Sequence, residues 1–153
     1  MKGLTAVANQ SKAAYLQTQV LTARPEQLTL MLFDGAIRFA EQGRAFIDEK
    51  RFDRSCDALA RAQNILIALI NGLRPEQAPE LCRRQAGLYL FVYKQLVLGN
   101  AQRDPAPIAD ALRILAILRQ TWLDLLLQLQ AQHPGGDSPA PAPRPPMALS
   151  IQG

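Results

Sequence analysis

The sequence predicts an all-α protein, an antiparallel up-down four-helix bundle. Apolar residues recur at spacings of three and four over long stretches, prolines and glycines divide these stretches into four segments, and no stretch alternates as a strand does. At about 1.5 Å per residue, such helices are rods of roughly 30–40 Å that short loops can join side by side. The 153 residues with 48% hydrophobic content fit one core. We therefore expect one bundle domain at residues 23–133.

The first helix is predicted at residues 25–48. Pro25 suits the first helical position, where a missing N–H costs nothing, and Glu26 places negative charge at the positive end of the helix dipole. Gly35 costs about 1 kcal/mol against Ala inside a helix, so we expect a neighbouring helix to approach closely there, with the approach of a bound partner as the alternative. The predicted apolar stripe consists of Leu28, Met31, Leu32, Gly35, Ala36 and Phe39.

Three further helices follow, at residues 53–73, 79–100 and 105–132. Asp104 is the expected cap of the last helix, and Pro105 its first residue. In the last helix we expect Trp122 to anchor the core with Leu115, Leu118 and Leu125. The apolar positions predicted for the second and third helices are Cys56, Leu59, Leu66, Ile70 and Leu73, then Leu81, Leu88, Val92 and Leu96.

The two ends of the chain differ from the bundle in composition. Residues 134–153 contain closely spaced prolines, which prevent helix and sheet, so we expect an extended, disordered tail. Residues 1–22 are polar and Ala-rich, and we expect a mobile segment.

A long motif lies at the start of the predicted bundle. The residues A-Y-x4-V-x-T-A-x-P-E-x-L-x-x-M-L-F-D-G-A, from Ala14 to Ala36, resemble the N-terminal signature of the flagellar secretion chaperones of the FliS family. The resemblance extends to about residue 132 through Leu88-Tyr89 with Phe91, Gly99-Asn100 before Asp104, and Leu118-Arg119 with Trp122. Two positions depart from the family pattern: Arg24 stands where a serine cap is usual, and Gly99 where an alanine is usual.

The resemblance implies binding and not catalysis. Members of the family bind the C-terminal segment of flagellin, prevent its premature polymerisation and deliver it to the flagellar export gate, without a cofactor. In that family the N-terminal segment, here with Tyr15, is implicated in covering the client site and in docking on the gate. A tyrosine that clamps the segment to the bundle is the alternative for Tyr15.

Several predicted helices carry more apolar residues than one buried face requires. I-L-I-A-L-I at residues 65–70 and L-Y-L-F-V-Y at residues 88–93 place apolar side chains on opposite faces. The surplus indicates a surface for an amphipathic partner segment, with core packing or self-association as the alternatives. The candidate partner-binding residues are Tyr15, Val20, Met31, Phe33, Ile37, Ile67, Ile70, Tyr89 and Tyr93.

Other function classes find little support. His133 is the only histidine and ends the last helix, so neither a catalytic triad nor a histidine metal site is indicated. Cys56 and Cys82 lie in separate segments and are expected to be reduced core thiols. The net charge of +4 is scattered, which argues against nucleic-acid binding, although a basic surface can steer an acidic partner.

The sequence also bears on location and on a rival function. No uninterrupted stretch of apolar residues is long enough to cross a membrane and no secretion signal is recognised, so we expect a soluble, cytoplasmic protein. The alternative function is a small homodimeric bundle with a structural or RNA-associated role. Whether the client-free protein dimerises is left open by the sequence.

Overall fold

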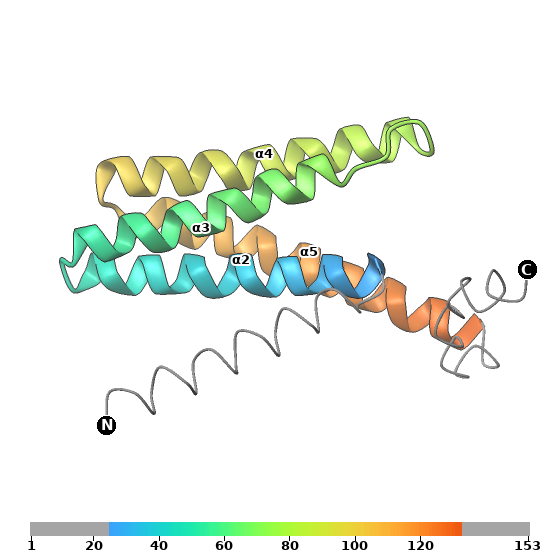
Figure 1. Ribbon diagram of the computed structural model, residues 1–153, viewed down its shortest axis with the longest axis horizontal. Helices are drawn as coiled ribbons and strands as arrows, with labels where there is room; N and C mark the ends of the chain where they lie inside the picture. Colours follow the sequence, from blue (N-terminus) through green and yellow to red (C-terminus); the bar gives the residue numbers. More distant parts are fainter. Residues whose placement is uncertain (1–24, 133–153) are drawn as a thin grey trace, which may run out of the picture. The chain divides into compact units, whose positions relative to one another are not determined.

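The computed structural model describes residues 25–132, which form four helices and no strand (Figure 1). The helices are α2 (Pro25–Asp48), α3 (Phe52–Asn71), α4 (Pro79–Gln102) and α5 (Pro105–Gln132). The predicted all-α class is confirmed, and the four predicted segments match the four helices closely. The expected N-terminal segment, which contains Tyr15 and Val20, lies outside the described residues, and so does the expected tail.

The chain divides into two compact units inside α5, between Arg119 and Gln120. Within the first unit, short connections reverse the chain direction, so that α2, α3 and α4 run antiparallel in sequence order (Figure 1). The most extensive packing is between α2 and α3, and α3 packs on α4 as well. The bundle is thus built from α2, α3, α4 and residues 105–119.

Prolines and caps set the helix starts. Pro25, Pro79 and Pro105 are the first residues of α2, α4 and α5. The predicted cap of α5 is confirmed, because the Ala106 N–H donates a hydrogen bond of 3.0 Å to Asp104 Oδ1. Helix α3 has no side-chain cap, and its first turn is held instead by the Ser55 N–H, which donates to the Arg51 carbonyl at 3.0 Å.

Two helix ends use a left-handed residue that is not glycine. Lys50 has φ 61° in the turn between α2 and α3, and Arg103 has φ 54° after α4. The turn at Lys50 is closed by the Arg51 N–H, which donates to the Phe46 carbonyl at 2.8 Å. These turns reverse the chain within a few residues. The left-handed conformation is strained for both residues, because each has a Cβ.

The buried face of α2 differs from the predicted stripe. Gly35 and Ala36 are buried as expected, but Leu28, Met31, Leu32 and Phe39 are only half-buried. The face continues instead through small residues, which let α3 come close. The buried residues of α2 are Phe33, Gly35, Ala36, Ala40, Gly43 and Ile47.

Glycines mark the closest approaches between helices. A Cβ at Gly35 would lie 3.1 Å from Ile65 Cδ1 of α3, so the expected close packing at Gly35 is confirmed. The approach is tighter at Gly43, where a Cβ would lie 2.5 Å from Leu59 Cδ2. At Gly99, the family's usual alanine would place its Cβ 2.5 Å from Ile108 Cγ1. The missing Cβ at Gly99 therefore lets Ile108 of α5 pack closely against α4.

The predicted core of the other helices needs several corrections. Leu59, Leu66, Val92 and Leu96 are buried, as are Leu115 and Leu118. Leu81, Leu88 and Leu125 are exposed, and Trp122 is half-buried, because the buried face of each helix is narrower than its apolar surface. Among the described residues, the largest fully buried apolar side chains are Phe33, Leu59, Leu66, Leu96, Ile108, Leu115 and Val92.

The cysteines are free thiols, but Cys56 is not a core residue. Cys56 is exposed at the edge of α3, next to the buried Ser55, and its Sγ donates a hydrogen bond of 3.2 Å to Asn100 Oδ1 of α4. Cys82 is half-buried. The Cys56–Asn100 contact fixes one level at which α3 and α4 lie side by side.

Candidate functional site

Exposed apolar side chains are concentrated on α4. In the part of the chain that the structure describes, more than half of the large exposed apolar residues belong to this helix. They are Leu81, Leu88, Leu90, Phe91, Val97 and Leu98; the others are Ile67 on α3 and Ile117, Leu125, Leu127 and Leu129 on α5. Contiguous exposed apolar area of this kind marks interaction surfaces on soluble proteins.

Four of the exposed residues lie on one side of α4, opposite its buried residues. The exposed fraction of each is 40–45%. Val97 follows Leu90, and Leu98 follows Phe91, after seven positions, which is two helical turns. The buried residues Tyr89, Val92, Leu96 and Gly99 occupy the other side. We refer to Leu90, Phe91, Val97 and Leu98 as the α4 outer face. The exposed Lys94 lies at its centre by helical register.

Three predicted site residues lie where α3 and α4 adjoin. Ile67 is 42% exposed, and Ile70 and Tyr93 are half-buried. Ile67 lies eleven positions after Cys56, and Tyr93 lies seven positions before Asn100; both spacings are nearly whole numbers of helical turns. Ile67 and Tyr93 therefore point to the same side as the hydrogen-bonded Cys56–Asn100 pair. We refer to Ile67, Ile70 and Tyr93 as the α3–α4 face.

Phe33 and Tyr89 occupy core positions. Their exposed fractions are 1% and 4%, and their ring centroids lie 6.2 Å apart in a tilted arrangement. The core alternative left open by the sequence thus accounts for both residues, whose side chains offer no surface to a partner. Burial, and secondarily the charge of Cys82, raises the pKa of Tyr89 from 10.0 to about 12.

Met31 and Ile37 do not form a surface with Phe33. Both residues are half-buried on α2, but six positions separate them, so they lie about 120° apart around the helix. All three residues are among the candidate partner-binding residues predicted from the sequence. Phe33 and Ile37 lie one turn apart on the same side of α2, and Met31 lies on another side. Phe33 contacts Tyr89 in the core, so among the described residues the α3–α4 face is the exposed surface that brings predicted residues together.

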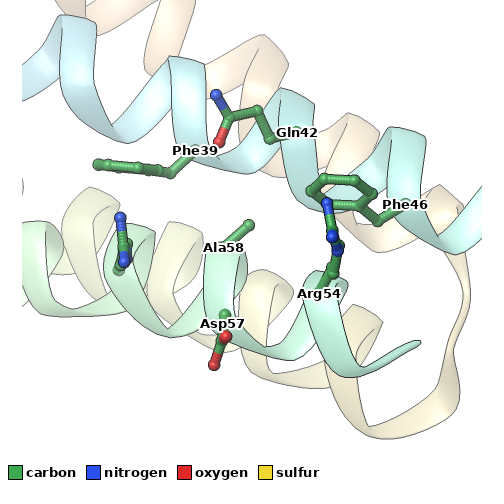
Figure 2. A pocket seen from close by; sticks show the side chains of 7 residues that line it. Phe39, Gln42, Phe46, Arg54, Asp57 and Ala58 are labelled. Atoms are coloured by element: carbon green, nitrogen blue, oxygen red, sulfur yellow. The ribbon is translucent and has the colours of Figure 1, made fainter. Parts of the chain in front are cut away.

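A pocket of about 260 Å³ lies between α2 and α3 on the outside of the bundle (Figure 2). Its aromatic lining comes from α2 and its charged lining from α3; Figure 2 shows Phe39 and Phe46 on α2, and Arg54 and Asp57 on α3. The residues that line it are Phe39, Gln42, Phe46, Arg54, Asp57, Ala58 and Arg61. We call this site the α2–α3 pocket. The pocket is not among the sites predicted from the sequence.

Arginine side chains stack on both phenylalanines of the α2–α3 pocket. The Arg61 guanidinium lies 5.6 Å from the centroid of the Phe39 ring, and the Arg38 guanidinium 5.1 Å from it. The Arg51 guanidinium lies 5.5 Å from the Phe46 ring. These distances are in the range of cation–π attraction, so the rings help to hold the cations at this surface.

The described residues also bear on metal binding and on membrane spanning. Within residues 25–132, no group of three or more His, Cys, Asp or Glu side chains is arranged to hold a metal ion. None of the helices α2 to α5 combines the length and the apolar character needed to cross a bilayer. His133 lies outside the described residues.

Comparison with known proteins gives a consistent family. The sequence model of a family described as flagellar protein FliS matches residues 7–128. The chain is similar to the flagellar secretion chaperone FliS of Bacillus subtilis (strain 168), at 31% identity over 71% of this chain and 80% of that protein. It is also similar to the flagellar secretion chaperones FliS of Vibrio cholerae, at 26% identity over 72% and 82%, and of Salmonella typhimurium (strain LT2), at 29% over 70% and 80%.

Proposed function

Because the chain belongs to the FliS family of flagellar secretion chaperones, which is not a class of enzymes, we propose that it binds the C-terminal segment of flagellin. Binding keeps flagellin from polymerising in the cytoplasm and delivers it to the flagellar export apparatus. The observation that carries this proposal is the α4 outer face, a two-turn apolar surface on the side of α4 away from the core.

A large apolar contact is what a disordered client requires. Ordering each residue of an unfolded segment costs about 1–2 kcal/mol in backbone entropy, and apolar burial returns about 25 cal/mol per Å². A client that folds as an amphipathic helix presents apolar side chains at spacings of three, four and seven. Leu90, Phe91, Val97 and Leu98 have the matching spacing, and Ile67 with Tyr93 extends the apolar surface toward α3.

The surface can be tested with charge substitutions. We expect the double variant Phe91→Asp/Leu98→Asp to weaken binding of the flagellin C-terminal segment by about a hundredfold, because each substitution removes an apolar contact and places a charge in the interface. Calorimetric titration measures the affinity. The matched control is Leu81→Asp/Ile117→Asp, which adds the same charge at apolar residues that are 61% and 57% exposed.

The outcomes test two points separately: whether the chain binds flagellin, and whether the α4 outer face is the surface that binds it. If the wild-type chain retains neither full-length flagellin on co-expression nor the isolated C-terminal segment, the chaperone proposal is wrong. If both double variants lose binding equally, the function stands but the α4 outer face is not its particular site. A stable dimer that flagellin does not dissociate, measured by sedimentation, would favour the structural alternative.

A second pair of substitutions tests the α3–α4 face. We expect Ile67→Asp/Ile70→Asp to abolish client binding while helicity and melting temperature stay close to the wild type. The exposed position of Ile67 supports this expectation, and Ile70 is half-buried. A collapse of the fold, followed by circular dichroism, would show that Ile70 belongs to the core.

Delivery to the export gate is assigned to the segment before α2. In this proposal Tyr15 and Val20 take part in docking on the gate or in covering the client surface. Tyr15→Ala should then reduce flagellin secretion in a cell that depends on this chain, while the purified variant retains its affinity for the flagellin segment. Unchanged secretion would leave Tyr15 without this role.

A further inference from the structure

We propose that the α2–α3 pocket binds an acidic segment of a partner protein, whose carboxylates are held by Arg54 and Arg61. The pocket is formed by α2 and α3 alone, and no residue of the α4 outer face lines it. It is therefore a second surface, with a chemistry unlike that of the proposed flagellin surface.

The two arginines provide donors that form no ion pair within the described residues, and one of the two guanidinium groups is restrained. Both side chains are exposed, and among residues 25–132 neither has a carboxylate within ion-pair distance. They lie seven residues apart on α3, which places them roughly 10 Å apart along one side of the helix. The stack of Arg61 on Phe39 restrains its guanidinium, and a restrained planar fork loses less entropy on binding a carboxylate.

The lining between the arginines favours a peptide over a nucleic acid. The Asp57 carboxylate lies between Arg54 and Arg61 in the sequence of α3 and lines the same pocket. A phosphate backbone carries negative charge at every step, so it would meet this carboxylate. A peptide can place acidic residues at both arginines and a neutral or hydrogen-bonding residue at Asp57.

The floor of the pocket suits a side chain with an apolar part. Phe39, Phe46 and Ala58 supply apolar surface, and Gln42 supplies an amide donor and acceptor. A volume of about 260 Å³ is below the range of roughly 300–1,000 Å³ typical of small-molecule pockets. It is large enough for a few peptide side chains and is bounded by cations, so an acidic peptide with interspersed apolar residues fits its chemistry.

The ends of this chain do not have the required charge. Residues 1–24 contain Lys2, Lys12 and Arg24 and no acidic residue, and residues 133–153 contain one acidic residue, Asp137, and one basic residue, Arg144. Neither segment offers the paired carboxylates that two arginines call for. Neither of these two segments is therefore the proposed occupant of the pocket.

The test uses a short fluorescein-labelled peptide in which Glu alternates with Phe and Ser, titrated with the full chain and followed by fluorescence anisotropy. We expect binding that weakens with added salt, and an affinity about tenfold lower for Arg54→Gln/Arg61→Gln. The control variant Arg83→Gln/Arg113→Gln changes the net charge equally at exposed arginines of α4 and α5 and should bind as the wild type does. The same peptide with Gln in place of Glu should not bind.

Three results would overturn the proposal: equal losses in the two double variants, no loss in either, or tighter binding of a single-stranded RNA of the same length with the same dependence on Arg54 and Arg61. Phe91→Asp/Leu98→Asp should leave peptide binding unchanged, so this site can fail or stand separately from the flagellin proposal. Because Arg54 and Arg61 are exposed, their variants should keep the wild-type melting temperature, which is measured alongside.

Discussion

Asp34 on α2 and Arg119 on α5 form an ion pair in which the Arg119 Nε–H donates a hydrogen bond to Asp34 Oδ1. Asp34 belongs to the L-F-D-G-A end of the N-terminal motif, and Arg119 belongs to the later Leu118-Arg119 landmark, 85 positions further along the sequence. Two landmarks of the family resemblance thus meet in space, and their contact joins the first helix of the bundle to the last.

We expect a modest but measurable coupling between these two residues. Their side chains are 48% and 35% exposed, so solvent screens the pair, and a coupling free energy of up to about 1 kcal/mol is reasonable. Urea unfolding of the wild type, Asp34→Ala, Arg119→Ala and the double variant measures it. The coupling should shrink in high salt. A coupling of zero at low salt would mean that the pair does not form in solution.

A second prediction concerns the close approach at Gly43. In Gly43→Ala the added Cβ would lie 2.5 Å from Leu59 Cδ2 and 2.6 Å from Leu59 Cγ, so Leu59 or the helix must move. We expect a loss of about 1–3 kcal/mol in the free energy of unfolding. The control is Gly87→Ala, since a Cβ at this exposed position of α4 meets no atom within 4 Å. That variant should gain about 0.5–1 kcal/mol from helix propensity, and a loss there would contradict the account.

The glycines also show how far the sequence predicted the fold. Helix boundaries were predicted well because Pro25, Pro79 and Pro105 start three helices and local chemistry is visible in one sequence. The buried face of α2 was predicted less well. Counting large apolar residues favours Leu28 and Phe39, whereas the face that packs on α3 is selected by the small size of residues such as Gly43.

Of the two candidate sites, the apolar surface on α4 could be predicted from the sequence and the α2–α3 pocket could not. The surplus of apolar residues on α4 is visible in the sequence, because the buried face of a helix has a limited width. The α2–α3 pocket is not visible there, since it depends on the register between two helices, which brings Arg61 beside Phe39. Whether Tyr89 or Tyr93 faced the core likewise depended on helix rotation, which packing decides.

A third prediction uses the left-handed residue Lys50. Lys50→Gly should raise the free energy of unfolding by about 0.5–1 kcal/mol, because glycine adopts φ 61° without the strain of a side chain. Arg103→Gly is the informative comparison. Its backbone gains the same relief at φ 54°, but it loses the Arg103 guanidinium 4.3 Å from the Phe52 ring, so we expect almost no net change. Equal gains in the two variants would show that the Arg103–Phe52 contact contributes nothing.

The last prediction concerns pH and the buried Tyr89. Its pKa is raised from 10.0 to about 12, chiefly because burial disfavours the phenolate. Below pH 10 the phenol is protonated in both folded and unfolded chains. As the pH rises from 10.0 toward 12, the unfolded chain ionises first, so the free energy of unfolding should fall by about 2–3 kcal/mol.

Urea unfolding across this pH range should show that Tyr89→Phe removes this part of the fall in the free energy of unfolding. Tyr93→Phe, at a half-buried tyrosine one turn further along α4, is the control and should keep it. If the two variants lose stability with pH in parallel, Tyr89 is not the group responsible.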